Sequence, residues 1–120
     1  MTRYLLSVHT PIEDRPSTLS EQEMRDGYAR IGDLEAELRA AGALVFSGRL
    51  DAPSAAKVVR ATGADAVTTD GPFLEAKEAI GGFYILEAAG DPEALDWAAK
   101  TSAAIGMPIE VRPFYDSHGA

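Results

Sequence analysis

The stretch from Val67 to Ala88 constrains the fold of this chain more strongly than any other. It reads as a β-rich segment, a sharp turn at Asp70-Gly71-Pro72, a short polar connection, a glycine pair and another strand. Asp tolerates turn conformations, Gly permits positive φ, and Pro fixes its own φ and lacks a backbone donor. Phe73 then places a large apolar side chain where the chain leaves the turn. The pattern predicts strand, turn and strand in the second half of the chain.

Capping and turn residues divide the rest of the chain into short elements. Ser20-x-x-Glu23 fits a capping box at the start of a helix, and Thr18-x-x-Glu21 offers a competing frame. Asp91 is predicted as the N-cap of a second helix, with Pro92 in its first turn. We predict strands at 3–9, 43–50, 56–61, 66–69, 83–87 and 109–114, helices at about 20–41 and from 91 onward, and an irregular connection or a turn of helix at 74–80.

This order of elements predicts an α+β fold of the ferredoxin-like βαββαβ type with an inserted β-hairpin. Two helices would cover one face of a single antiparallel sheet. A large bare apolar face is not tolerated in a soluble monomer, so we expect two sheets to pair face to face in a homodimer. The cavity between the sheets is then the expected ligand site, because concave pockets lined by inward side chains are where small molecules bind.

Length and composition exclude several classes of protein. The 120 residues predict one domain over 1–120, and with no cysteine there are no disulfides, thiolate nucleophiles or zinc–thiolate sites. The net charge of −8 would repel phosphate backbones, so nucleic-acid binding is not expected. The amino terminus lacks a cleavable apolar pattern and no apolar run is long enough to span a membrane, so we expect a cytoplasmic protein without a membrane partner.

Asp70 and His9 are the candidate catalytic residues. Asp70 stands before Gly-Pro, where its carboxylate would either cap its own turn or act as a general base at a cavity mouth. His9 ends the first predicted strand and would be either a half-exposed surface group or a polar group at the rim of the cavity. Nothing in the sequence shows that the two side chains meet.

Four further residues are candidates for contacting a ligand. Arg49 near the end of a strand is either a surface residue or an anion-binding group at a cavity mouth, and Tyr84 and Arg112 lie on strands whose inward face the sequence does not fix. Phe73 is the fourth. No metal site or organic cofactor is expected, because His9 and His118 lie at opposite ends of the chain without a partner at ligand spacing.

The chain resembles the YCII-related family, in the branch named for Asp-Gly-Pro-Phe. The resemblance is carried by 70–73, Glu75, Lys77-Glu78 and Gly81-Gly82-Phe83-Tyr84, and extends to 3–6, 38–42, 94–98 and 110–113. It implies a ferredoxin-like domain that pairs into a dimeric α+β barrel, and it implies the same inserted hairpin. It further implies a His–Asp catalytic pair with the His on the first helix near Ile31, where this chain has no His.

Two classes of function follow. The first is a dimeric protein that binds a small molecule in the intersheet cavity and could act as a cofactor-independent acid–base enzyme. The alternative is a non-catalytic regulatory or interaction module, because relatives of the family occur beside or fused to transcription sigma factors. An enzyme would have a ligand-binding cavity, whereas a module would have a filled core between its sheets.

Overall fold

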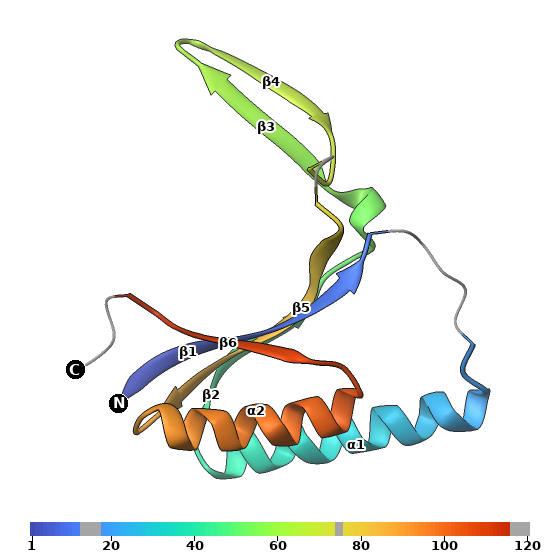
Figure 1. Cartoon of the computed structure of the whole chain (residues 1–120), viewed down its shortest axis with the longest axis vertical. Coiled ribbons are helices and arrows are strands. Elements are labelled where there is room, and N and C mark those ends of the chain that lie inside the picture. The colour runs from blue at the N-terminus through green and yellow to red at the C-terminus, as the bar shows by residue number, and fades with distance from the viewer. Residues whose placement is uncertain (13–17, 74–75, 116–120) are drawn as a thin grey trace.

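The computed structural model describes residues 1–12, 18–73 and 76–115, arranged as a four-stranded sheet, two helices and a separate hairpin (Figure 1). The elements in chain order are β1 (Thr2–Pro11), α1 (Glu21–Ala40), β2 (Leu44–Arg49), the short 3-10 helix η1 (Pro53–Ala55), β3 (Lys57–Thr62), β4 (Asp65–Asp70), β5 (Glu78–Ala88), α2 (Asp91–Ile105) and β6 (Ile109–Pro113).

The main sheet has the order β2-β5-β1-β6, and every neighbouring pair is antiparallel. Both helices lie on one side of it, as Figure 1 shows. This mixed arrangement is compatible with the ferredoxin-like α+β fold predicted from the sequence. β1 is a central strand, because it pairs with β5 on one side and β6 on the other. None of the described helices is long and apolar enough to cross a membrane.

The first helix begins where the capping box predicted. The Ser20 side chain accepts a hydrogen bond from the Glu23 amide at 3.1 Å, and the Glu23 carboxylate accepts one from the Ser20 amide at 3.2 Å. These two bonds satisfy amide donors that a helix start otherwise leaves unpaired. The helix ends at Ala40 with Ala41 as C-cap, and the next residue, Gly42, has a φ of 67° in the left-handed region that favours glycine.

The start of the second helix differs from the prediction by one residue. Gly90 is the N-cap and Asp91 is the first helical residue. The Asp91 carboxylate is used elsewhere, since the Tyr4 hydroxyl donates to it at 2.7 Å. No side chain caps this helix start, and the Glu93 carboxylate accepts a hydrogen bond from the amide of Ala89, which precedes the N-cap, at 2.7 Å.

The strand predicted at 83–87 is longer at its amino end. β5 begins at Glu78, because residues 78–80 pair with Pro11, Thr10 and His9 of β1. Pairing with a neighbouring strand thus overrides the helix-forming composition of this stretch. Of the connection predicted at 74–80, residues 74–75 lie outside the described ranges.

The core lies between the sheet and the helices. On α2 the buried side chains are small, and the larger Leu95 is 56% exposed. On α1, Tyr28 is 61% exposed. The buried cluster consists of Tyr4, Leu6, Leu34, Leu38, Ala43, Tyr84, Leu86, Ala88, Ala94, Ala98 and Ala104.

The two faces of the sheet differ because successive side chains of a strand point to opposite sides. Tyr84 points toward α1, where its hydroxyl meets Glu35, so its neighbours Phe83 and Ile85 point the other way. The strand register then assigns residues of β1, β2 and β6 to the same side as Phe83 and Ile85. We call this side the helix-free face; it carries Leu5, Ser7, His9, Phe46, Phe83, Ile85, Glu110 and Arg112.

Candidate functional site

A pocket of about 610 Å³ lies between the sheet, α1 and the end of α2. We call it the helix-side pocket, because most residues that line it belong to the helices or to the covered face of the sheet; Phe83 of the helix-free face also borders it. A neighbouring hollow of about 450 Å³ at the start of α1 shares Tyr28, Ile31, Arg49 and Ile105 with it. The pocket is lined by Val8, Thr10, Tyr28, Ile31, Glu35, Ser47, Gly48, Arg49, Gly81, Gly82, Phe83, Tyr84, Ile105 and Met107.

Backbone that approaches closely forms the floor of the pocket. The register of β1 against β5 shifts between Val8 and His9, opposite the Gly81-Gly82 pair. A Cβ at Gly82 would lie 3.3 Å from the carbonyl oxygen of Gly48 on β2. A Cβ at Gly48 would in turn lie 3.3 Å from the ring of Phe83, while the bulge of β2 lies between Leu44 and Phe46.

Tyr84 and Glu35 form a hydrogen-bonded pair that reaches the pocket. Tyr84 is 6% exposed, and its hydroxyl donates to Oε1 of Glu35 at 3.0 Å. Arg39, one turn further along α1, lies 3.9 Å from the other carboxylate oxygen. Burial raises the pKa of the Tyr84 hydroxyl above its usual value, the bond to Glu35 raises it further, and Arg39 opposes this slightly. The phenol is therefore held protonated, and Glu35 is held as an acceptor.

Arg49 supplies a positive charge at the mouth of the pocket. It ends β2, is exposed, and lines both hollows. Within residues 1–12, 18–73 and 76–115, its guanidinium forms no ion pair with a carboxylate. A guanidinium presents donors in a planar fork that matches a carboxylate or a phosphate. Arg49 is therefore available to hold an acidic group of a ligand.

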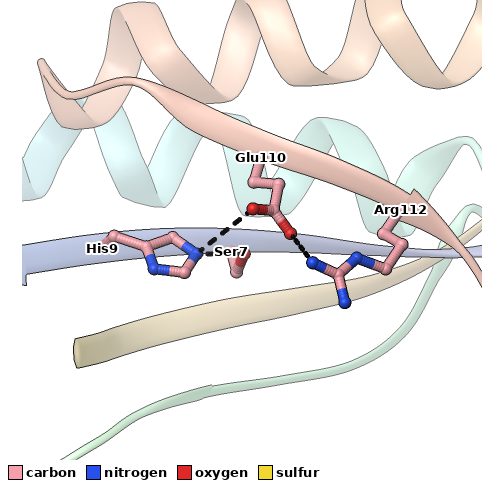
Figure 2. A network of polar contacts seen from close by, with 4 residues as sticks. All are labelled: Ser7, His9, Glu110 and Arg112. Atoms are coloured by element: carbon pink, nitrogen blue, oxygen red, sulfur yellow. Dashed lines mark hydrogen bonds and ion pairs between the residues drawn. The ribbon is translucent and has the colours of Figure 1, made fainter. Parts of the chain in front are cut away.

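The helix-free face carries a second polar group, which we call the His9 network and which consists of Ser7, His9, Glu110 and Arg112 (Figure 2). Nε2 of His9 lies 3.0 Å from the Ser7 hydroxyl and 3.9 Å from Glu110 Oε2. The Arg112 guanidinium donates to the other oxygen of Glu110 at 2.7 Å. Both partners of His9 sit on the same ring nitrogen, so the ring does not relay a proton from the serine to the carboxylate as a catalytic triad does.

Asp70 lies away from both groups, at the end of the β3–β4 hairpin. Its side chain is 88% exposed, and its Oδ1 accepts a hydrogen bond from Lys57 Nζ at 2.6 Å. Among the described residues the carboxylate is thus bound to a side chain on the facing strand rather than to the turn backbone. Phe73 follows it and is 63% exposed.

The structure brings the sequence candidates together in two pairs. Arg49 and Tyr84 line the same pocket, while His9 and Arg112 meet through Glu110 on the opposite face. Asp70 contacts neither pair in the part of the chain that the structure describes. The intersheet cavity expected from the sequence requires a second copy of the chain and stays a prediction; the pocket formed within one chain lies on the other side of the sheet.

Glu35 is the pocket residue that the sequence reasoning missed. In the sequence, Glu35 is one of several charged residues in this helix, a pattern that is typical of a solvated face. The available signal was its spacing, because Glu35 lies four residues after Ile31 and therefore on the same side of the helix. Ile31 is the position near which the family resemblance implies a His.

The described residues contain no cluster of three His, Asp or Glu side chains suited to a metal ion. The helix-side pocket instead offers one cation, Arg49, one carboxylate, Glu35, and the phenols of Tyr28 and Tyr84 in a largely apolar lining. Such a set can orient an acidic organic molecule through hydrogen bonds. Acid–base chemistry by Glu35 would require a ligand that displaces the Tyr84 hydroxyl from its carboxylate.

Replacing Tyr84 with Phe is expected to lower the free energy of unfolding by about 1 kcal/mol near pH 8, the scale of one hydrogen bond. The difference should then narrow as the pH rises above 10. In the wild type the unfolded chain loses the Tyr84 proton at lower pH than the folded chain, so stability falls with rising pH, and the variant lacks this titration. Urea unfolding of both proteins from pH 8 to 11 measures it; a difference that widens with pH would contradict the assigned environment.

Comparison with known proteins agrees with the fold. Residues 8–115 match the family model of the YCII-related domain. An uncharacterized protein of Rhizobium meliloti (strain 1021) is 36% identical over 95 residues, which cover 78% of this chain and 73% of that protein. The family match includes every strand of the main sheet, both helices and the hairpin, except for the first residues of β1. The chain therefore belongs to the YCII-related family.

Proposed function

We propose that this protein binds a small organic molecule with an acidic group in the helix-side pocket. The observation that carries the proposal is Arg49, a cation at the mouth of a pocket whose other lining is largely apolar. Ligand sites typically combine an apolar lining with a few convergent polar groups that fix orientation.

The motif at 70–73 supports placing the protein in the Asp-Gly-Pro-Phe branch of its family.

Different residues of the pocket lining would contact different parts of the ligand. The guanidinium of Arg49 holds the acidic group through two parallel hydrogen bonds. Ile31, Ile105 and Met107 contact an apolar body. Glu35 accepts a hydrogen bond from a hydroxyl or amine at the other end. Because the chain carries a net charge of −8, its distant charges repel an anion, so the affinity comes from short-range contacts with Arg49.

We further propose that the protein is a homodimer that joins two sheets through their helix-free faces into a dimeric α+β barrel. Phe46 on this face is 59% exposed, and its ring lies 5.9 Å from that of Phe83. Leu5 and Ile85 beside them are partly exposed. A contiguous apolar surface of this kind marks an interaction site in a soluble protein. Pairing would enclose the His9 network between the sheets.

The binding proposal is tested by a thermal-shift screen of small carboxylic acids, followed by calorimetric titration of the strongest hit. The Arg49→Gln variant should bind that hit at least ~10-fold more weakly, since a hydrogen bond to a charged group contributes about 1.5–3 kcal/mol. Arg25→Gln is the matched control, because Arg25 is exposed on α1 and does not line the pocket. Equal affinities of wild type and Arg49→Gln would remove Arg49 from the site. A dimer that binds no member of the screen would favour the interaction module.

A further inference from the structure

The β3–β4 hairpin stands apart from the rest of the protein. Its two strands pair with each other in a separate sheet and not with the main one. Only Val58 is buried, while Val59 and Val67 are 62% and 61% exposed. At its base, the Gly71 amide donates to the Ala56 carbonyl at 2.8 Å. Two-stranded hairpins without a covering layer are marginally stable in water, so this one needs a packing partner.

The dimensions of the molecule also indicate that the hairpin needs a packing partner. The radius of gyration is 16.8 Å and the extents are 46 × 44 × 19 Å. A compact domain of this length would have a radius of gyration of about 13.6 Å. The excess comes from the hairpin, which projects beyond the sheet (Figure 1). A projecting hairpin does not contribute to the core of its own chain.

The direction of the hairpin identifies what can cover it. In Figure 1 the helices lie on one side of the main sheet and the hairpin rises on the opposite side, over the helix-free face. Any molecule packed on that face would therefore lie alongside the hairpin. The hairpin is also electrically neutral, because Lys57 and Arg60 balance Asp65 and Asp70, whereas the whole chain carries −8. A neutral segment can approach an acidic second copy without repulsion.

We propose that the β3–β4 hairpin is an arm that clasps a second copy of this chain. The inference rests on the homodimer proposed above and adds a second contact surface to it. Each hairpin packs on the partner that covers the helix-free face, and the partner's hairpin does the same in return, as twofold symmetry requires. The strands β3 and β4 are thus stabilised by the partner rather than by their own chain.

Hydrogen–deuterium exchange measured at protein concentrations below and above the dimer dissociation constant tests the arm. Amides of residues 57–70 should exchange at least ~10-fold more slowly in the dimer, because packing on a partner suppresses local opening. Amides in the middle of α1 serve as the internal control and should change little. Equal hairpin exchange in monomer and dimer would overturn the arm while leaving the dimer intact. Absence of a dimer at every concentration would overturn both proposals.

Two single substitutions provide a second, independent readout. Val59 and Val67 lie on opposite faces of the hairpin, since Val59 is registered with Thr68 and Val67 with Arg60. Only one face can meet the partner, so one of Val59→Asp and Val67→Asp should weaken dimerisation at least ~10-fold and the other should not. Sedimentation velocity measures both. If neither substitution changes the dissociation constant, the hairpin does not contact the partner and the arm is overturned.

Discussion

Aspartate in place of Phe46 is expected to convert the proposed homodimer into a monomer at micromolar concentration. Phe46 is 59% exposed in the single chain and contacts Phe83 on the helix-free face. Burying an aromatic side chain against a partner contributes about 2 kcal/mol. A twofold interface contains the residue twice, so the loss is about 4 kcal/mol, or roughly a thousandfold in the dissociation constant.

Sedimentation velocity and light scattering give this result directly, and Leu95→Asp is the matched control. Leu95 is 56% exposed, almost the same as Phe46, but lies on α2 on the covered side of the sheet. The control should remain dimeric. A Phe46→Asp protein that is still dimeric would show that the helix-free face is not the interface.

The Leu38→Ala variant is expected to lose about 2–5 kcal/mol in the free energy of unfolding. Leu38 is fully buried where α1 packs on the sheet and α2, so truncation leaves a cavity in the core. Alanine has the highest helix propensity, so the helix itself is not weakened and the loss reports packing alone.

Urea unfolding at a fixed protein concentration measures this loss, with Leu95→Ala as the helical control. An exposed position should change the free energy of unfolding by no more than about 0.5 kcal/mol. A loss below about 1 kcal/mol at Leu38 would mean that α1 does not pack against the sheet as described.

Local signals in the sequence predicted most of the fold. The capping box at Ser20 and Glu23 involves only four residues, and Gly42 and Gly63 end or turn the chain through their own backbone freedom. The hairpin could be predicted because its strands are consecutive. The start of β5 could not, because Glu78 is held in a strand by Pro11, a residue far away in sequence.

The candidate site was harder to predict than the fold. Whether a residue belongs to it depends on the face of the sheet to which its side chain points, and not on the type of residue alone. Tyr84 and Phe83 are adjacent, yet one reaches the helix-side pocket through its side chain and the other faces away from the helices. Glu35 looked like one more charged residue on a solvated helix. Its contact with Tyr84 depends on where β5 lies, and the spacing of residues along α1 does not show this.

Asp70 is prominent in the sequence but lies away from the pocket. Its place before Gly71-Pro72 made it the most conspicuous residue of the sequence, and catalysis by it remains a prediction. The geometry gives it an exposed contact with Lys57, and surface ion pairs of this kind contribute about 0–1 kcal/mol. The ligand site that we propose is instead the helix-side pocket, which no turn motif in the sequence indicates.

The sheet separates two groups of polar residues, those of the helix-side pocket and those of the His9 network. In the sequence analysis both groups were candidates for a single cavity. Alternation along β1 and β5 sends Val8 and Tyr84 toward the helices and His9 and Phe83 away from them. The proposed function therefore requires the ligand to bind on the side of the sheet that the helices cover.

Two-dimensional NMR of the nitrogen-15-labelled protein, titrated with the strongest acid from the screen, answers this question directly. The largest amide shift changes are expected around the helix-side pocket, at Ile31, Arg49, Tyr84 and Met107. Shift changes concentrated instead at the His9 network, with those pocket amides unmoved, would contradict the proposed function and place the ligand between the sheets.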